Sequence, residues 1–427
     1  MLNSKRIKVK DFDGFLLAVA IVISLFGLLT IFSAAHSGPM SNNKLWIAQA
    51  IRLGIALVAM FVALIIEYRI LYGFSYIIYV IWAVLLAILL TFPEQSGVRR
   101  WFMKGAIQPS ELAKIILIIT LARFLSDKKH VADQFRIFAG AMVIVMVYTI
   151  LIFMQPALGY ALTLIPIALS MFYIGGISST YLLLLIIPGF VASSATIIIC
   201  HKGWDITATS SLIKIALVSF GYGVLSLFAY YMISKTRTRN GKKWVKFVSI
   251  CIFAGFLMAL AGTGILKDYQ KARLLAFVNP DFDPKGAGYQ IIQSKIAIGA
   301  GGIFGQGYLK GTQNRLDFLP AQHTDFVFSV VAEEWGFVGA VFLMFLFLTL
   351  ITRCLKAAYK ADDDFGALLA TGITAMIITQ VFMNIGMTVG MMPITGVPLP
   401  LMSYGGSSLV ATFISVGLIL NVRLKRQ

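Results

Sequence analysis

Long uninterrupted apolar runs are the feature that most restricts how this chain can fold. They recur from residue 13 to residue 422, and each is about 20 residues long, enough for one helix to cross the hydrocarbon core of a bilayer. Hydrophobic residues make up 59% of the 427 residues and charged residues 13%, whereas soluble domains average about 45–50% and about 25%. The runs do not alternate as the strands of a porin-like barrel would. The sequence therefore predicts a polytopic membrane protein.

We predict an all-α fold with about 12 transmembrane helices, in which residues 1–427 form a single integral membrane domain. The runs stand at 13–35, 45–66, 70–92, 110–126, 137–154, 158–176, 180–200, 211–234, 245–265, 326–352, 365–390 and 404–422. The first run follows a basic segment but has no clear small-x-small cleavage site, so we expect a retained span. A large loop covers 266–325.

Basic residues gather in four of the five even-numbered connections between the runs and after the last run. They are Arg69, Lys128, Lys129, Arg136, Lys235, Arg237, Arg239, Lys242, Lys243, Lys246, Arg353, Lys356, Lys360, Arg423, Lys425 and Arg426. Under the positive-inside rule these connections and both termini are cytoplasmic. The net charge of +18 then follows from membrane topology, and we expect no nucleic-acid partner.

Two segments on the opposite side break this charge pattern. Residues 93–109 contain Arg99 and Arg100, and residues 266–325 contain seven Lys and Arg residues. A long loop is usually functional, and its basic residues indicate an anionic ligand at the outer face. Because residues 286–311 are glycine-rich and apolar, we expect them to fold back against or into the membrane. Their glycines could also cradle a phosphate, although the segment contains no G-x-G-x-x-G motif between a strand and a helix.

Carboxylates at the end of this loop are candidates for acid–base chemistry. Asp325 directly precedes the run at 326–352, which soon carries Glu333 and Glu334. A poorly solvated carboxylate suits a general base near neutral pH. The structural alternative for Asp325 is a helix N-cap, worth about 1 kcal/mol. Glu333 would lie about 80° round a helix from Asp325, whereas Glu334 would point to the opposite face, so we expect that the two acids do not share one role.

The run at 110–126 holds a second pair of charged candidates. Glu111 and Lys114 stand at i and i+3, which suits either a mutual ion pair or contact with a substrate. Ser110 is expected to cap this helix. Trp101 suits an interface anchor, and beside Arg100 it would also suit a sugar and a phosphate.

The segment 396–408 is too rich in proline, glycine and polar residues for a plain helix. It predicts either a structural kink or a broken helix that contacts substrate. The three cysteines, Cys200, Cys251 and Cys354, are widely spaced, so they predict neither a disulfide framework nor a zinc site.

Several motifs, in this order, resemble the SEDS family (shape, elongation, division and sporulation), polytopic peptidoglycan glycosyltransferases of bacteria. The motifs are 96–101, 108–114, 286–290, 293–294, 297–299, 323–326 and 398–408. They touch most of the chain from residue 96 to residue 410, and their combination is specific. Within the family, residues 384–387 and 392–400 resemble the RodA branch, which elongates rods, more than the FtsW division branch.

The resemblance implies an enzyme that polymerises lipid II. A growing glycan on a polyprenyl pyrophosphate is the donor, and the GlcNAc 4-hydroxyl of an incoming lipid II is the acceptor. The family's essential carboxylate maps onto Asp325, which we expect to be the general base. The expected substrate-binding residues are Arg99, Arg100, Trp101, Glu111, Lys114, Asp317, His323 and Ser403. Mg²⁺ or Mn²⁺ would help to screen a pyrophosphate, but no ligand cluster is apparent, and the sequence assigns no metal residue.

The resemblance also implies a location and partners. The location is the bacterial cytoplasmic membrane, with the active site on the extracytoplasmic side. Besides lipid II, the lipid-linked glycan and membrane lipid, the partners are a class B penicillin-binding protein and the elongation machinery. The alternatives are a lipid II flippase, an FtsW-type division polymerase and a non-catalytic scaffold. Charges concentrated near one face favour catalysis there over flipping.

The sequence departs from the family pattern in three places. Family members usually have ten spans, so we interpret 211–265 as an inserted helix pair and 266–325 as the catalytic loop. Ala157 stands where the family commonly has Asp, and Ala321 replaces a frequent Glu. These differences leave Asp325 in place.

Overall fold

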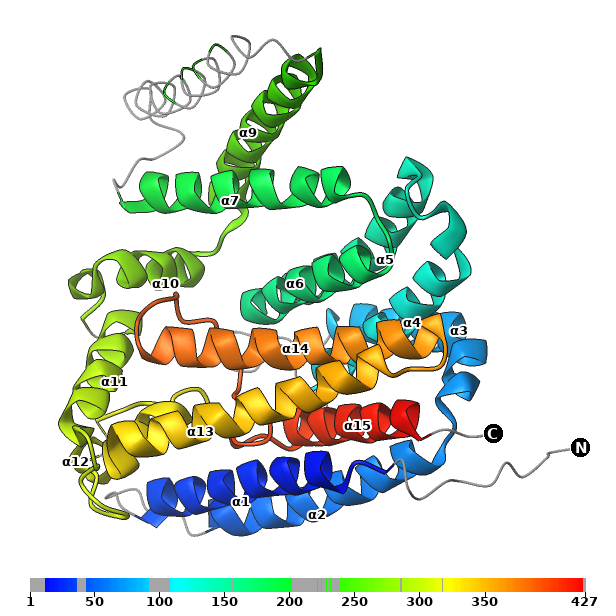
Figure 1. Ribbon diagram of the computed structural model, residues 1–427. Helices are drawn as coiled ribbons and strands as arrows, with labels where there is room; N and C mark the ends of the chain where they lie inside the picture. The colour runs from blue at the N-terminus through cyan, green and yellow to red at the C-terminus, as the bar shows by residue number, and fades with distance from the viewer. Residues whose placement is uncertain are drawn as a thin grey trace, which may run out of the picture. The chain divides into compact units, whose positions relative to one another are not determined.

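The computed structural model describes residues 12–36, 44–91, 108–155, 157–201, 239–284, 286–316 and 318–424, with single positions at 221, 224, 228 and 231. All regular structure within these residues is helical (Figure 1), so the predicted all-α class is confirmed. The chain divides into two compact units, one made of residues 1–177 and 290–427 and the other of residues 178–289.

The first unit holds most of the helices. They are α1 (Gly14–His36), α2 (Lys44–Ile65), α3 (Tyr68–Leu89), α4 (Pro109–Asp127), η2 (Lys129–Val131), α5 (Phe135–Met154), α6 (Leu158–Ile174), α12 (Thr312–Arg315), α13 (Val327–Tyr359), α14 (Asp364–Thr388) and α15 (Gly406–Arg423). α11 (Ala287–Gly301) begins in the second unit and continues into the first.

Eight described helices are long and apolar enough to cross a membrane, which agrees with a multi-pass protein. α6 and residues 247–262 are shorter apolar helices. Most of the predicted span at 211–234 lies outside the described residues, so the total of about 12 spans and the inserted pair at 211–265 remain predictions. The predicted span at 245–265 begins earlier, at Arg239, within the basic segment.

Three helices form the interior of the first unit. α4 packs against both α14 and α15, and the most apolar stretches of α14 and α15 are each 72% buried. By contrast, those of α2 and α3 are 17% and 11% buried, so most of their apolar side chains face outward. A helix that is apolar on all sides can occupy either position, inside a bundle or against lipid.

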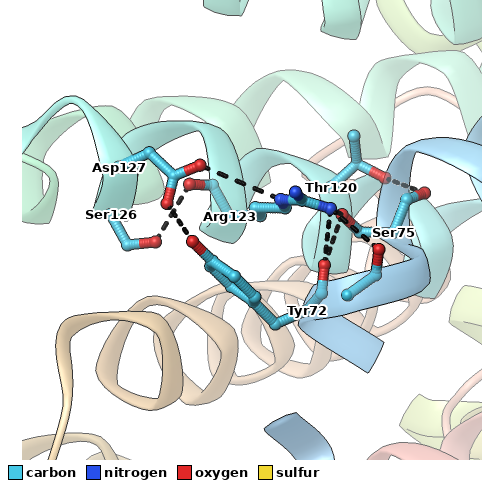
Figure 2. Close-up of polar contacts among 7 residues, drawn as sticks. Tyr72, Ser75, Thr120, Arg123, Ser126 and Asp127 are labelled. Carbon is cyan, nitrogen blue, oxygen red and sulfur yellow. Dashed lines mark hydrogen bonds and ion pairs between the residues drawn. The ribbon is translucent and has the colours of Figure 1, made fainter. Parts of the chain in front are cut away.

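A polar network fixes the C-terminal half of α4 against α3. Arg123 Nη1 donates to the carbonyl oxygens of Tyr72 (2.7 Å) and Gly73 (3.0 Å). The Tyr72 hydroxyl in turn donates to Asp127 (2.5 Å), which also lies 3.8 Å from Arg123 Nε (Figure 2). Thr120 donates to the Ser75 carbonyl at 3.3 Å. This network holds the end of α4 that lies away from Glu111 and Lys114.

Helix ends are also tied together by the buried Asp13. Its Oδ1 accepts the Leu16 N–H at the start of α1 (3.1 Å), and its Oδ2 pairs with Arg353 of α13 (3.6 Å) and with Arg423 of α15. A buried carboxylate needs such partners, because an isolated one would be strongly destabilising.

The second unit contains α7 (Ser179–His201), α9 (Arg239–Ile265), α10 (Asp268–Val278), η3 (Pro280–Phe282) and the start of α11. Ala195 and Ile199 of α7 form a buried apolar cluster with Phe256 and Ala259 of α9. Gly255 permits this close packing, because a Cβ there would lie 2.6 Å from the Pro188 carbonyl oxygen.

The segment 266–325, which the sequence predicts as a loop, is largely helical. It contains α10, η3, α11 and the short α12. Four backbone hydrogen bonds of 2.9–3.1 Å join residues 302–307 to residues 333–338 of α13. α13 is broken there, because Gly336 has φ 64° and ψ −161°. A Cβ on Gly336 would lie 2.3 Å from the Gly305 nitrogen, so glycine is required at the break.

Candidate active site

A cavity of about 170 Å³ brings together residues from distant parts of the sequence within the first unit. Its lining consists of Gln108, Glu111, Tyr160, Thr324, Asp325, Gly396, Pro398, Tyr404, Gly405, Gly406, Ser407 and Ser408. The sequence candidates Glu111 and Asp325, some 200 residues apart, therefore share one cavity with the segment 396–408. This segment is non-helical up to Gly405, as its composition predicts.

The backbone around Asp325 is fixed at three successive carbonyl groups. The Tyr404 N–H donates to the His323 oxygen (2.8 Å), and the Ser403 hydroxyl donates to the Thr324 oxygen (2.6 Å). Asn384 Nδ2 of α14 donates to the Asp325 oxygen and also to the Val397 oxygen, both at 2.9 Å. The segment is thus held by α14 and by the chain before α15.

Asp325 does not cap α13, so the N-cap interpretation is wrong. α13 begins at Val327, and its N-cap residue is Phe326, which makes no side-chain capping bond. Asp325 lies instead in a turn in which the Ala321 oxygen accepts the N–H groups of residues 324, 325 and 326. Ala321 has φ 55°, a left-handed conformation that is uncommon for a residue with a Cβ.

Glu111 and Lys114 form a buried ion pair on the first turns of α4. The Lys114 Nζ lies 2.7 Å from Glu111 Oε2, and both side chains are 1% exposed. Lys114 Nζ also lies 5.2 Å from the centre of the Tyr160 ring. Because Glu111 and Tyr160 line the cavity, the pair lies next to the site and substrate contact remains open.

The start of α4 differs from the prediction in its cap. Gln108 is the N-cap residue and Pro109 occupies the first helical position, so the expected cap at Ser110 is wrong. Proline is well suited to this position, because its fixed φ matches the helix and it lacks the N–H that would have no partner. The Trp82 indole donates to the Pro109 oxygen (3.0 Å) and ties this helix start to α3.

His323 and Ser403 hold the site together in ways that the sequence does not reveal. The Ser403 hydroxyl donates to Thr324 and accepts the Leu399 N–H (2.8 Å), so both contacts position the backbone. The His323 ring stands edge-on to the Tyr404 ring, with centres 5.6 Å apart. Contact of these two residues with substrate remains a prediction.

Four predicted substrate-binding residues, Arg99, Arg100, Trp101 and Asp317, lie outside the described residues, and their roles remain predictions. Glu333 and Glu334 are described and buried, and they do not line the cavity. Glu333 accepts from the Thr312 hydroxyl (3.2 Å) and the Gln313 N–H (2.7 Å), whereas Glu334 accepts from the Ser33 hydroxyl. The two acids therefore serve different parts of the fold.

Tyr308 lies near these acids and outside the long apolar helices. Its hydroxyl donates to the Leu29 oxygen at 3.2 Å. Burial, and secondly the negative charge of Glu334, raise the pKa of Tyr308, so it remains a donor at neutral pH.

Several residues of the site were missed by the sequence interpretation. Asn384 and Gln49 lie within predicted spans, and Gln49 Nε2 donates to the Ser403 oxygen (3.2 Å) while its Oε1 accepts the Gly405 N–H (3.3 Å). The Arg52 guanidinium lies 4.5 Å from the centre of the Tyr404 ring. The available signal was a polar or charged side chain inside an apolar run, which usually serves a specific contact.

Within the described part of the chain, no group of three or more His, Cys, Asp or Glu side chains could hold a metal ion.

Comparison with known proteins gives consistent matches over nearly the whole chain. Residues 14–225 and 238–427 match the model of a cell cycle protein family that comprises FtsW, RodA and SpoVE. The chain is 34% identical to the peptidoglycan glycosyltransferase RodA of Treponema pallidum, covering 98% of this chain and 99% of that protein. It is 32% identical to the peptidoglycan glycosyltransferase MrdB of Escherichia coli (97% and 94% covered) and 33% identical to a probable peptidoglycan glycosyltransferase FtsW of Geobacter metallireducens (99% and 96%).

Solved structures show the same fold. A chain from a peptidoglycan synthase complex that coordinates polymerization and crosslinking has a TM-score of 0.66 and 30% identity, with 96% of this chain and 97% of that chain covered. The Thermus thermophilus Rod shape determining protein RodA has a TM-score of 0.60 and 26% identity, with 96% of each chain covered.

Proposed function

Because the chain belongs to the SEDS family, the FtsW/RodA/SpoVE cell cycle proteins, we propose that it is a peptidoglycan glycosyltransferase that polymerises lipid II during cell elongation. The similarity to RodA and MrdB over nearly the whole chain supports the activity. The resemblance of residues 384–387 and 392–400 to the RodA branch supports elongation over division.

The observation that carries this proposal is the cavity in which Asp325, Glu111 and the segment before α15 meet. Polymerisation requires a base for the acceptor hydroxyl and donors for the developing charge on the leaving pyrophosphate. Asp325 supplies a carboxylate on a backbone that is fixed at three carbonyl groups. Such fixing favours catalysis, because misplacement by about 1 Å can reduce a rate about a hundredfold.

Asp325 acts as the general base in this proposal. It takes the proton from the GlcNAc 4-hydroxyl of the acceptor while that oxygen attacks C1 of the donor sugar. The C1–O bond to the pyrophosphate breaks, and its electron pair goes to the phosphate oxygen. Lys114 forms an ion pair with Glu111 at 2.7 Å. We propose that Lys114, with Arg99 and Arg100, acts near the donor pyrophosphate.

We place the cavity at the extracytoplasmic side of the bacterial cytoplasmic membrane, with both termini in the cytoplasm. α4 and α15 each begin at the cavity and end beside basic residues, Lys129 and Arg423 respectively. Those residues belong to the clusters that the positive-inside rule assigns to the cytoplasm.

A class B penicillin-binding protein and the elongation machinery are the partners that we propose. The similarity to a chain from a peptidoglycan synthase complex supports a partner of this kind. Mg²⁺ or Mn²⁺ would act by screening the pyrophosphate charge and would need no dedicated protein site.

The decisive experiment compares wild type and Asp325→Asn, each purified with its partner and incubated with lipid II. The amide cannot accept the proton, so we expect polymerisation to fall by at least about 10²–10⁴-fold while the melting temperature is retained. Asp133→Asn, an exposed acid between η2 and α5, is the matched control and should polymerise normally.

Normal polymerisation by Asp325→Asn would exclude Asp325 as the base. Translocation of labelled lipid II without polymer from the wild type would indicate a flippase. Normal cell elongation in a strain that carries Asp325→Asn as its only copy would indicate a scaffold.

A further inference from the structure

Two helix N-termini converge on the cavity that contains Asp325. α4 begins after its N-cap Gln108 and α15 begins after its N-cap Gly405, and both caps line the cavity. The Gln108 N–H donates to the Ser407 hydroxyl oxygen (2.8 Å), which joins the two helix starts directly. The first N–H groups of a helix have no acceptor within it, and the helix dipole makes this end attractive to anions.

The side chain of Gln108 independently indicates an acceptor in this cavity. Gln108 is 4% exposed, and the Tyr160 hydroxyl lies 3.4 Å from its Oε1 as the donor. This contact orients the amide, and its Nε2 has no hydrogen-bond partner among the described residues. A buried donor without an acceptor is unfavourable by about 1–3 kcal/mol, so a bound acceptor would remove that penalty.

Arg52 adds a positive charge at the start of α15. A Cβ on Gly406 would lie 3.1–3.5 Å from the Arg52 side chain, so the arginine lies against the first helical residue. Among the described residues Arg52 stacks on Tyr404 and makes no ion pair. A cation beside a helix N-terminus is unfavourable by itself, and a bound anion would be attracted by both.

The negative groups at this site are Glu111 and Asp325. Glu111 forms an ion pair with Lys114 at 2.7 Å, and Asp325 is the other carboxylate that lines the cavity. The amide of Gln108, the α15 N-terminus and Arg52 together oppose the repulsion between these carboxylates and a bound anion.

We infer that the start of α15, Gln108 and Arg52 bind the pyrophosphate that leaves the donor substrate. This inference rests on the proposed polymerase function. In that reaction the proton accepted by Asp325 comes from the oxygen that attacks the donor C1, and the departing phosphate oxygen is bonded to this same carbon. The donor pyrophosphate must therefore lie close to Asp325, whereas the acceptor pyrophosphate is two sugar rings away.

The site contributes to the chemical step through the leaving group. The acceptor oxygen bonds to C1, the C1–O bond breaks, and the electron pair remains on the polyprenyl pyrophosphate. Fixed donors aimed at the oxygen on which charge develops stabilise this step most when water is excluded. Arg52 and Gln108 are binding residues, and Asp325 remains the base.

The test uses full-length protein in detergent with its partner, and farnesyl pyrophosphate as the probe. Arg52→Gln removes a positive charge and Gln108→Leu removes an N–H donor. Each should weaken binding of the probe about tenfold and raise its inhibition constant in the polymerisation assay by the same factor. Arg52→Lys should recover part of the loss, since the charge remains but the planar donor set does not. Lys129→Gln removes a positive charge from the other end of α4 and should change neither value.

The outcomes separate this inference from the proposed function. Failure of wild type to polymerise lipid II, or normal polymerisation by Asp325→Asn, would overturn the proposed function. An active wild type, an inactive Asp325→Asn and unchanged farnesyl pyrophosphate inhibition in both Arg52→Gln and Gln108→Leu would overturn the inference alone. Phosphatidylglycerol micelles could also compete with farnesyl pyrophosphate for the site. If they compete equally well, and the Arg52→Gln and Gln108→Leu variants lose this competition, the site binds a lipid headgroup and the inference is overturned.

Discussion

Asn384 shows how one side chain can determine the geometry of a site that it does not line. Its amide nitrogen serves the carbonyl groups of Asp325 and Val397, so it joins the candidate base to the segment before α15. The sequence placed Asn384 in a motif that distinguishes branches of the family. Its contacts assign it a positioning role.

Replacing Asn384 with Leu should therefore reduce both stability and activity. Two carbonyl groups would lose their donor. Each would lower the free energy of unfolding by about 1–3 kcal/mol if it stays buried and unpaired. We expect a lower melting temperature and, per folded molecule, at least about tenfold slower polymerisation.

Asn421→Leu is the matched control at the same scale. Asn421 donates to the Ala63, Leu64 and Ile66 carbonyl groups, away from the cavity. This variant should lose comparable stability while its folded fraction polymerises at the wild-type rate. Equal rate losses in both variants would show that Asn384 acts through stability alone.

At the scale of elements, the break in α13 depends on glycine. Gly336→Ala would place a Cβ 2.3 Å from the Gly305 nitrogen and require a left-handed φ of 64°. We expect a destabilisation of at least about 1–3 kcal/mol, measured as a lower thermal midpoint in detergent. Gly54→Ala in α2, where no atom lies within 4 Å, should be neutral or slightly stabilising. Equal midpoints for the two variants would contradict the argument.

The short helix α12 is anchored to the same region by Glu333. Glu333→Gln replaces the carboxylate that accepts the Gln313 N–H with a neutral amide. We expect this hydrogen bond to become weaker by about 1 kcal/mol. Hydrogen exchange of the Gln313 amide should then become about fivefold faster. Glu67→Gln, which changes a partly exposed acid outside this segment, should leave that exchange rate unchanged.

The sequence predicted the apolar elements better than the connections between them. Spans such as 13–35 and 365–390 follow from continuous apolar composition, which is a local property. The helices α10 to α12 were not predicted, because short helices depend on tertiary packing more than on propensity. The break at Gly336 was not predicted either, because the residues that fill it lie some 30 positions earlier in the chain.

The candidate site was predicted in its chemistry but not in its assembly. Asp325, Glu111 and Lys114 were identified as ionisable groups near the ends of spans, and the structure brings Asp325 and Glu111 to one cavity. Arg52 and Gln49 were overlooked, because a single polar residue hardly changes the hydropathy of a long run. Their partners, Tyr404 and Ser403, are more than 350 residues away.

At the scale of the whole molecule, the two ends of α4 and α15 have different surroundings: the cavity lies at their first residues, and basic residues of the predicted cytoplasmic clusters lie at their last. α4 and α15 start at the cavity, whereas Lys129 pairs with Asp364 and Arg423 pairs with Asp13 at the far ends of these helices. This separation agrees with a membrane crossed by both helices in the same direction.

Cysteine labelling in intact cells tests the proposed orientation. In a background with Cys200, Cys251 and Cys354 replaced by Ser, Asp281→Cys should react with a membrane-impermeant maleimide from outside. Asp362→Cys should react only after permeabilisation. Both native acids are exposed, so accessibility of the side chain does not decide the result. The reverse pattern would place the cavity in the cytoplasm and exclude its use of lipid II at the outer face.

The three hydrogen bonds to residues 323–325 have a consequence for how such an enzyme can be switched on. A segment attached at three adjacent points to two other parts of the chain cannot shift by the rotation of a single loop. A regulator that binds elsewhere must instead displace α14 or the residues before α15 as a body. Activation would then be a change between two discrete packings, with few intermediate levels of turnover.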